Sequence, residues 1–171
     1  MNFRISLMVV FSTLGVALAE HHGLPGKAPL FGNLGNRHHK VSTANDDAQR
    51  YFDQGLTLCW AFNHPEAIRS FERAAKLDPD CAMAYWGLAF AHGSNINMPM
   101  MPDAVAPANE AIKNAQALAS GASEAEQAYI AALAKRYSED PKAERPVLDQ
   151  AFAAAMKDVA KKYPNDLDAQ T

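Results

Sequence analysis

Apolar and polar residues follow one another along most of this chain with the period of an α-helix. From Pro65 onward, apolar residues recur every three or four positions, at Ala67, Ile68, Phe71, Ala74 and Ala75. Pro65 is favoured in a first helical turn, and proline cannot continue a helix, so this helix is expected to end at Leu77-Asp78-Pro79. A helical pattern from about Asp46 to Phe62 precedes it. Together the two patterns predict a helical hairpin over residues 46–79.

The same organisation is expected to continue toward the C-terminus. Residues 82–119 form a second hairpin, interrupted by the Pro-, Gly- and Asn-rich insertion Gly93–Asp103. Residues 123–163 form a third hairpin, because Ser123-Glu124-Ala125-Glu126 is a capping box that opens a helix. We expect Asp166–Thr171 to begin the first helix of a further unit.

The first two hairpins share a residue register. Ala82 stands 34 residues after Ala48, and large and small residues recur at matching positions. The register consists of Tyr51, Gly55, Ala67, Phe71, Ala74, Pro79, Tyr85, Leu88 and Ala89. These residues resemble the signature of the tetratricopeptide repeat (TPR), a helix-turn-helix unit of about 34 residues. The resemblance implies that residues 46–171 form an all-α, right-handed solenoid of such units. Two positions depart from the signature: Gln54 stands at an apolar position, and His92 stands where Tyr or Leu is usual.

The resemblance also reaches a particular group of proteins. Residues 51–102 are similar to exported bacterial TPR proteins, which are generally much longer and have no assigned biochemical activity. The resemblance implies a non-enzymatic protein–protein interaction scaffold of the bacterial envelope, and we expect the chain to be the N-terminal part of a longer protein. Its partner would be a protein or peptide held in a groove of first-helix residues, for which Arg50, Gln54 and Met83 are candidates.

Residues 1–19 have the pattern of a secretory signal peptide. Arg4 precedes the apolar run Ile5–Ala19, which closes on Ala17-Leu18-Ala19. The run is shorter than the roughly 20 residues that a transmembrane helix needs. Cleavage after Ala19 would give a periplasmic or secreted protein with no membrane span, and an uncleaved N-terminal anchor is the alternative.

Residues 20–45 are predicted to form an extended N-terminal arm, because they are rich in Gly and Pro and show little helical periodicity. The arm carries the pairs His21-His22 and His38-His39. Paired histidines can bind a metal ion, but two pairs on a flexible arm are not an organised site. A polar tail with incidental histidines is the simpler interpretation.

Composition and motifs narrow the range of functions. The chain is 49% hydrophobic and 20% charged, which is typical of globular proteins. Sixteen basic and 19 acidic residues give a net charge of −3, which does not support nucleic-acid binding. The sequence has no phosphate-binding Gly-rich loop, His-Glu-x-x-His motif or Gly-x-Ser-x-Gly elbow. We expect no enzyme activity and no cofactor, although the chain could be the interaction module of a longer enzyme.

Three methionines give a second candidate function. Met98, Met100 and Met101 lie close together in a loop that follows His92. Thioether and imidazole ligands suit Cu(I), so an envelope copper-binding protein is the alternative. Methionine also fills irregular apolar gaps, and packing is the simpler interpretation of this loop.

The two cysteines and two tryptophans each allow two interpretations. Cys59 and Cys81 are expected at different ends of neighbouring helices, farther apart than the roughly 7 Å between Cα atoms that a disulfide permits. Buried free thiols are therefore favoured over a disulfide formed after export. Trp60 and Trp86 are expected to pack between repeats; as exposed aromatic residues on a concave face, they would instead anchor a peptide.

Overall fold

The computed structural model describes residues 28–140 and 142–170, which form helices and loops with no strand. The prediction of a signal peptide over residues 1–19 and the pair His21-His22 lie outside the described residues. The α-helices are α1 (Asp46–Trp60), α2 (His64–Leu77), α3 (Ala82–His92), α4 (Val105–Leu118), α5 (Glu124–Ala134) and α6 (Arg145–Lys162). Short 3₁₀ turns, η1 (Pro102–Ala104) and η2 (Ala119–Gly121), flank α4. The all-α class is therefore confirmed.

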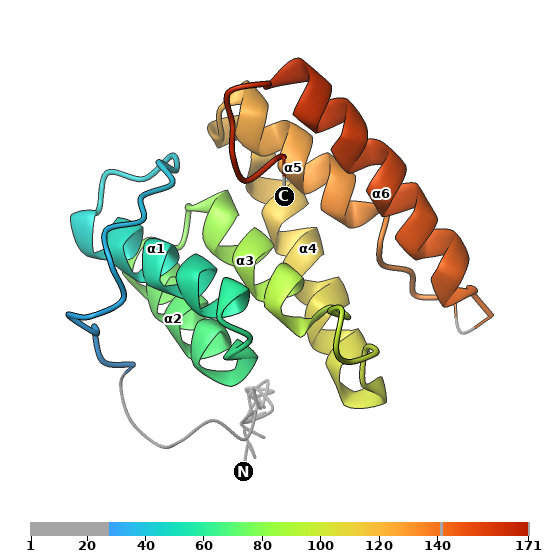
Figure 1. The fold of residues 1–171 in the computed structure, drawn as a ribbon, viewed down its shortest axis with the longest axis horizontal. Helices are drawn as coiled ribbons and strands as arrows, with labels where there is room; N and C mark the ends of the chain where they lie inside the picture. Colours follow the sequence, from blue (N-terminus) through green and yellow to red (C-terminus); the bar gives the residue numbers. More distant parts are fainter. Residues whose placement is uncertain (1–27, 141, 171) are drawn as a thin grey trace, which may run out of the picture.

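The helices pack in the order of the sequence. Each helix contacts the next, and α1 also contacts α3, as α3 contacts α5. Figure 1 shows α1 and α2 at one side of the molecule, α3 and α4 in the middle, and α5 and α6 at the other side. No helix among the described residues is both long enough and apolar enough to cross a membrane.

Local signals fix the helix ends. The Asn45 side chain accepts a hydrogen bond from the Ala48 N–H and caps α1, and the predicted capping box of Ser123 and Glu126 opens α5. The α1 helix ends at Trp60, two residues before the predicted end at Phe62, which adopts φ = 59°. That left-handed residue lets the Asn63 N–H reach back to the Leu58 carbonyl and close the helix.

Phe71 occupies the centre of the packing between the first three helices. Its fully buried ring lies against Gly55 of α1 and Gly87 of α3. A Cβ atom at Gly55 would lie 2.7 Å from a ring carbon of Phe71, so the absence of a side chain there permits the close approach of α1 and α2. The small residues of the register therefore act by allowing short distances between helices.

The other register residues share this packing environment. The buried ones are Ala67, Ala74 and Ala89. Tyr51, Tyr85 and Leu88 are half-buried against the same core, whereas Pro79 is exposed after the end of α2.

Cys59 and Cys81 are both buried with free thiols. Residues 167–170 form turns that fold back beside α5 and α6, where the sequence pattern predicts the start of a further helix.

Candidate peptide-binding surface and aromatic cavity

The described part of the N-terminal arm, residues 28–45, lies along α1 and is held mainly through its backbone. At its first residues, the Tyr51 hydroxyl donates to the Ala28 carbonyl at 2.9 Å. The Gln54 carboxamide donates to the Pro29 carbonyl and accepts from the Phe31 N–H, each at 2.8 Å. Gln54 also donates to Ser70 Oγ of α2, which fixes the orientation of its carboxamide. Gln54, the polar residue at an apolar position of the register, therefore clamps the first residues of the arm onto α1.

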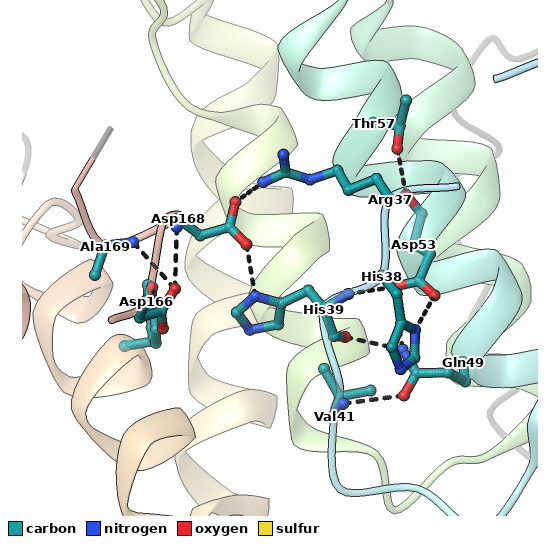
Figure 2. Close-up of polar contacts among 11 residues, drawn as sticks. Arg37, His38, His39, Val41, Gln49, Asp53, Thr57, Asp166, Asp168 and Ala169 are labelled. Carbon is teal, nitrogen blue, oxygen red and sulfur yellow. Dashed lines mark hydrogen bonds and ion pairs between the residues drawn. The ribbon is translucent and has the colours of Figure 1, made fainter. Parts of the chain in front are cut away.

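The later part of the arm is held in the same way. Gln49 donates to the His39 carbonyl at 2.9 Å and accepts from the Val41 N–H at 3.0 Å. The Asp53 carboxylate accepts from the His39 N–H at 2.9 Å, and the Glu126 carboxylate of α5 accepts from the Ser42 N–H at 2.6 Å. Figure 2 shows Gln49 and Asp53 of α1 reaching the arm at His39 and Val41.

We call the five residues that make these contacts the candidate peptide-binding surface; they are Gln49, Tyr51, Asp53, Gln54 and Glu126. Their partners on the arm are mainly N–H and C=O groups, which every polypeptide carries. Glu126 and Asp53 also contact the side chains of Ser42 and His38. Two arm side chains, Ala28 and Val41, are buried at 5% and 1% exposure, whereas Phe31 is 42% exposed. The surface therefore holds the backbone of the arm on both sides of a turn at residues 32–33, and two small apolar side chains of the arm are buried.

Glu126 is adapted to this role by its hydrogen bonds. Burial alone would raise the pKa of this carboxyl, but bonds from Ser42 and Ser123 outweigh burial and hold the pKa below its usual range. The carboxylate accepts from the backbone and hydroxyl of Ser42 and from the backbone of Ser123. One residue thus caps α5 and anchors the arm.

A second group of polar residues joins the arm to the C-terminal turn. His39 Nδ1 lies 2.6 Å from Asp168 Oδ2, and the Arg37 guanidinium forms an ion pair with the same carboxylate. Asp166 accepts from the Tyr129 hydroxyl at 2.8 Å and from the Asp168 N–H at 3.0 Å. We call Arg37, His39, Asp166 and Asp168 the clasp. Figure 2 shows Arg37 and His39 pointing toward the Asp168 carboxylate, and the Asp166 carboxylate beside the backbone of Asp168 and Ala169.

The ionisation of the clasp follows from its surroundings. Burial lowers the pKa of His39, opposed by the Asp166 carboxylate and reinforced by the Arg37 charge. A neutral imidazole has one N–H, and the Asp168 carboxylate only accepts, so that proton is on Nδ1. Burial, with the hydrogen bond to Asp166, raises the pKa of Tyr129 and keeps its hydroxyl protonated as a donor.

The clasp also has the composition of a metal site. Ligand atoms of His39, Asp166 and Asp168 lie within 4.8 Å of one another. However, the Arg37 guanidinium already neutralises Asp168, and a positively charged partner at that position opposes a metal ion. Both carboxylate oxygens of Asp166 already accept hydrogen bonds, from the Tyr129 hydroxyl and from backbone N–H groups. The arrangement is better explained as an internal ion pair than as a metal centre.

Next to the clasp lies a largely apolar cavity of about 240 Å³, here called the aromatic cavity. Its walls from α1 and α3 are Phe52, Leu56, Trp60, Met83, Trp86 and Phe90. The remaining walls are formed by Tyr129, Phe152, Met156, His39, Asp168 and Ala169.

Aromatic rings pack against one another in these walls. Trp86 stacks on Phe90 with centroids 5.2 Å apart, meets Tyr129 edge-on at 5.7 Å and donates its indole N–H to the Tyr129 carbonyl. Trp60 is 39% exposed and lies beside Phe90 at the surface.

Comparisons of the chain with protein-family models, curated proteins and solved structures give no match. The site therefore has to be interpreted from its own geometry.

The residues proposed for copper have different environments. Met98 and Met101 are 53% and 50% exposed, and His92 is half-buried at the end of α3. Met100 Sδ lies 3.2 Å from Arg145 Nη1, so a guanidinium occupies the approach to that sulfur. A cation bound there would have to overcome this charge.

The candidate groove residues have different environments. Arg50 is exposed and pairs with Asp47, Gln54 is buried beneath the arm, and Met83 is 1% exposed in the cavity wall. Trp60 and Trp86 pack between helices and also line the cavity. The sequence pattern singles out Gln54 but not Gln49 or Asp53, and it marks Glu126 only as a helix cap. It marks His39 only as one of a histidine pair and does not indicate the clasp.

Proposed function

We propose that the chain is a TPR-type helical-repeat module that binds an extended segment of a protein partner, without covalent chemistry. The single observation that carries the proposal is the backbone recognition of the arm by the candidate peptide-binding surface. The backbone of the arm is already held there at two short stretches, by paired donors and acceptors from Gln54 and from Gln49. The pattern of residues 1–19 supports placing this function in the bacterial envelope or outside the cell.

The TPR assignment rests on packing and register together. Contacts of α1 with α3 and of α3 with α5 are those expected where equivalent helices of successive repeats lie side by side. Gly55 and Phe71, which stand at the small and aromatic positions of the signature, are in direct contact. These relationships support a repeat architecture.

In this proposal the arm is an internal occupant of the binding surface. A partner segment would replace the arm along α1, offering backbone groups to Gln49 and Gln54 and a small apolar side chain where Val41 is buried. Because the arm is tethered, it competes at an effective concentration of about 1 mM, so displacement requires a partner with additional contacts.

The test is peptide binding in trans. A fluorescent peptide with the sequence of residues 28–43 is titrated with the full chain carrying Val41→Asp, which disfavours the chain's own arm by burying a charge. We expect anisotropy to show binding at least about tenfold tighter than to the wild-type chain, whose arm competes. Adding Gln49→Ala and Gln54→Ala to the receptor should weaken binding by a further tenfold or more.

Two results would contradict the proposal. One is no binding to the Val41→Asp chain when its circular dichroism spectrum matches that of the wild type. The other is binding that persists unchanged when both glutamines are replaced. A peptide that itself carries Val41→Asp is the matched control and should not bind.

A further inference from the structure

The aromatic cavity has an apolar body and one polar end, which is the arrangement of a small-molecule site. Phe52, Met83 and Trp86 are almost completely buried in its walls, so most of its surface is shielded from water. Trp60, Phe152 and Met156 are only partly buried and mark the side that is open to solvent.

Its size limits the ligand. An apolar cavity of about 150 Å³ in another protein accommodates benzene. A cavity of about 240 Å³ is larger than one ring requires and suits a molecule of one or two fused rings. Aromatic walls favour aromatic ligands, since edge-to-face and offset contacts add to the burial of apolar area.

The polar end supplies a hydrogen-bond acceptor. His39 contacts Phe52 and Tyr129 with ring centroids 6.0 and 5.9 Å away, which places its imidazole in the cavity wall. Its Nδ1 is engaged with Asp168, so in the neutral ring Nε2 carries a lone pair. Among the described residues, no hydrogen bond is made to Nε2.

We propose that the aromatic cavity binds a small aromatic molecule of one or two rings that bears an N–H or O–H donor, with the rings in the cavity and the donor on His39 Nε2. Indole and phenols belong to this class. Gln49 and Gln54 do not line the cavity, but His39 belongs to the arm, so a segment that displaced the arm would also remove the acceptor from the cavity.

The test uses indole as the probe and the chain's two tryptophans as reporters. Both Trp60 and Trp86 line the cavity, so the indole N–H peaks in a ¹H–¹⁵N correlation spectrum of the labelled full chain report on occupancy. Trp60→Phe assigns the two peaks. We expect both to shift and saturate with indole, and 1-methylindole, which lacks the donor, to bind about two- to tenfold more weakly.

Two sets of variants, at His39 and on α6, test where the ligand binds. His39→Phe removes the acceptor and should make indole and 1-methylindole bind equally, whereas His39→Gln, which can donate to Asp168 and still accept, should retain the preference. Met156→Phe narrows the cavity and should weaken indole binding, whereas Ala154→Phe, on the exposed side of α6, should not. Arg50→Leu, at an exposed residue of α1, should also leave indole binding unchanged. Because indole is titrated into the chain without added peptide, its failure to bind is distinguishable from a failure of the proposed function.

Any of three results would overturn the inference. The first is the absence of peak shifts up to the solubility limit of indole. The second is equal affinity of the wild-type chain for indole and 1-methylindole. The third is indole binding that is insensitive to Met156→Phe.

Discussion

His39 and Asp168 are 129 residues apart in the chain and share a 2.6 Å hydrogen bond. This bond connects the N-terminal arm to the C-terminal turn beside the aromatic cavity. Arg37 reinforces the connection through the same carboxylate. The first residues of the arm are therefore held by α1, and Arg37 and His39 are held by Asp168. The N-terminal arm and the C-terminal turn are in direct contact.

Stability should depend on pH through His39. Its pKa is lower in the folded chain than the ordinary 6.5, so the unfolded chain binds more protons once the pH falls through 6.5. The free energy of unfolding should therefore decrease from pH 7 to 5 and level off below the folded-state pKa. The carboxylates of Asp166, Asp53 and Glu126 favour the charged form of His39, but burial outweighs them. The pKa of Glu126 itself is held below its usual range by hydrogen bonds.

Urea unfolding at pH 7, 6 and 5 measures this effect. His39→Gln should reduce the slope of unfolding free energy against pH. His64 also has a pKa lowered by burial, so His64→Gln reports its separate share of the slope. A slope that is unchanged by His39→Gln would show that His39 does not titrate differently in the folded chain.

Gly55→Ala should destabilise the fold. The added Cβ would meet the Phe71 ring at 2.7 Å, and relieving such overpacking costs about 1–3 kcal/mol of unfolding free energy. Gly121→Ala is the control, because no atom lies within 4 Å of its Cβ position, and it should change stability by less than about 0.5 kcal/mol. Equal stability of the two variants would contradict the close packing at Gly55.

Gln54→Leu should release the start of the arm while leaving the helices folded. Leucine restores an apolar residue at the register position but cannot bond the Pro29 carbonyl or the Phe31 N–H. Limited trypsin digestion, followed by mass spectrometry, should then show faster cleavage after Arg37 and Lys40. Arg50→Leu alters an exposed neighbour on the same helix and should leave these rates unchanged; equal rates in both variants would count against the clamp.

The two thiols should be unreactive in the native protein. Burial raises the pKa of Cys59 to about 12 and also raises the pKa of Cys81, so little thiolate forms at pH 8. Iodoacetamide should modify neither residue in buffer and both in denaturant without reductant. Failure to modify them in denaturant would indicate a disulfide instead.

Local signals made the helices predictable. Proline at the start of α2, Pro79 after its end and the capping box at Ser123 act through neighbouring residues only, so the boundaries were close to those observed. The end of α1 was misplaced because Phe62 takes a left-handed conformation that glycine usually provides.

The site was less predictable because it depends on contacts between distant segments. The arm has no periodic pattern, and its position is set by hydrogen bonds between its backbone and α1. The cavity likewise combines α1 and α3 with Phe152 of α6 and Asp168 of the final turn. The histidines at 38 and 39 have specific partners, which the interpretation as an incidental polar tail did not anticipate.

The central claim is that side chains of the candidate peptide-binding surface hold the backbone of the arm, and amide hydrogen exchange of the arm tests it most directly. The N–H groups of Phe31, His39, Val41 and Ser42 are bonded to Gln54, Asp53, Gln49 and Glu126, respectively. Lys40 N–H has no such bond among the described residues. These four amides should exchange slowly, and the Lys40 amide should exchange fast. Uniformly fast exchange throughout residues 28–43 would contradict it.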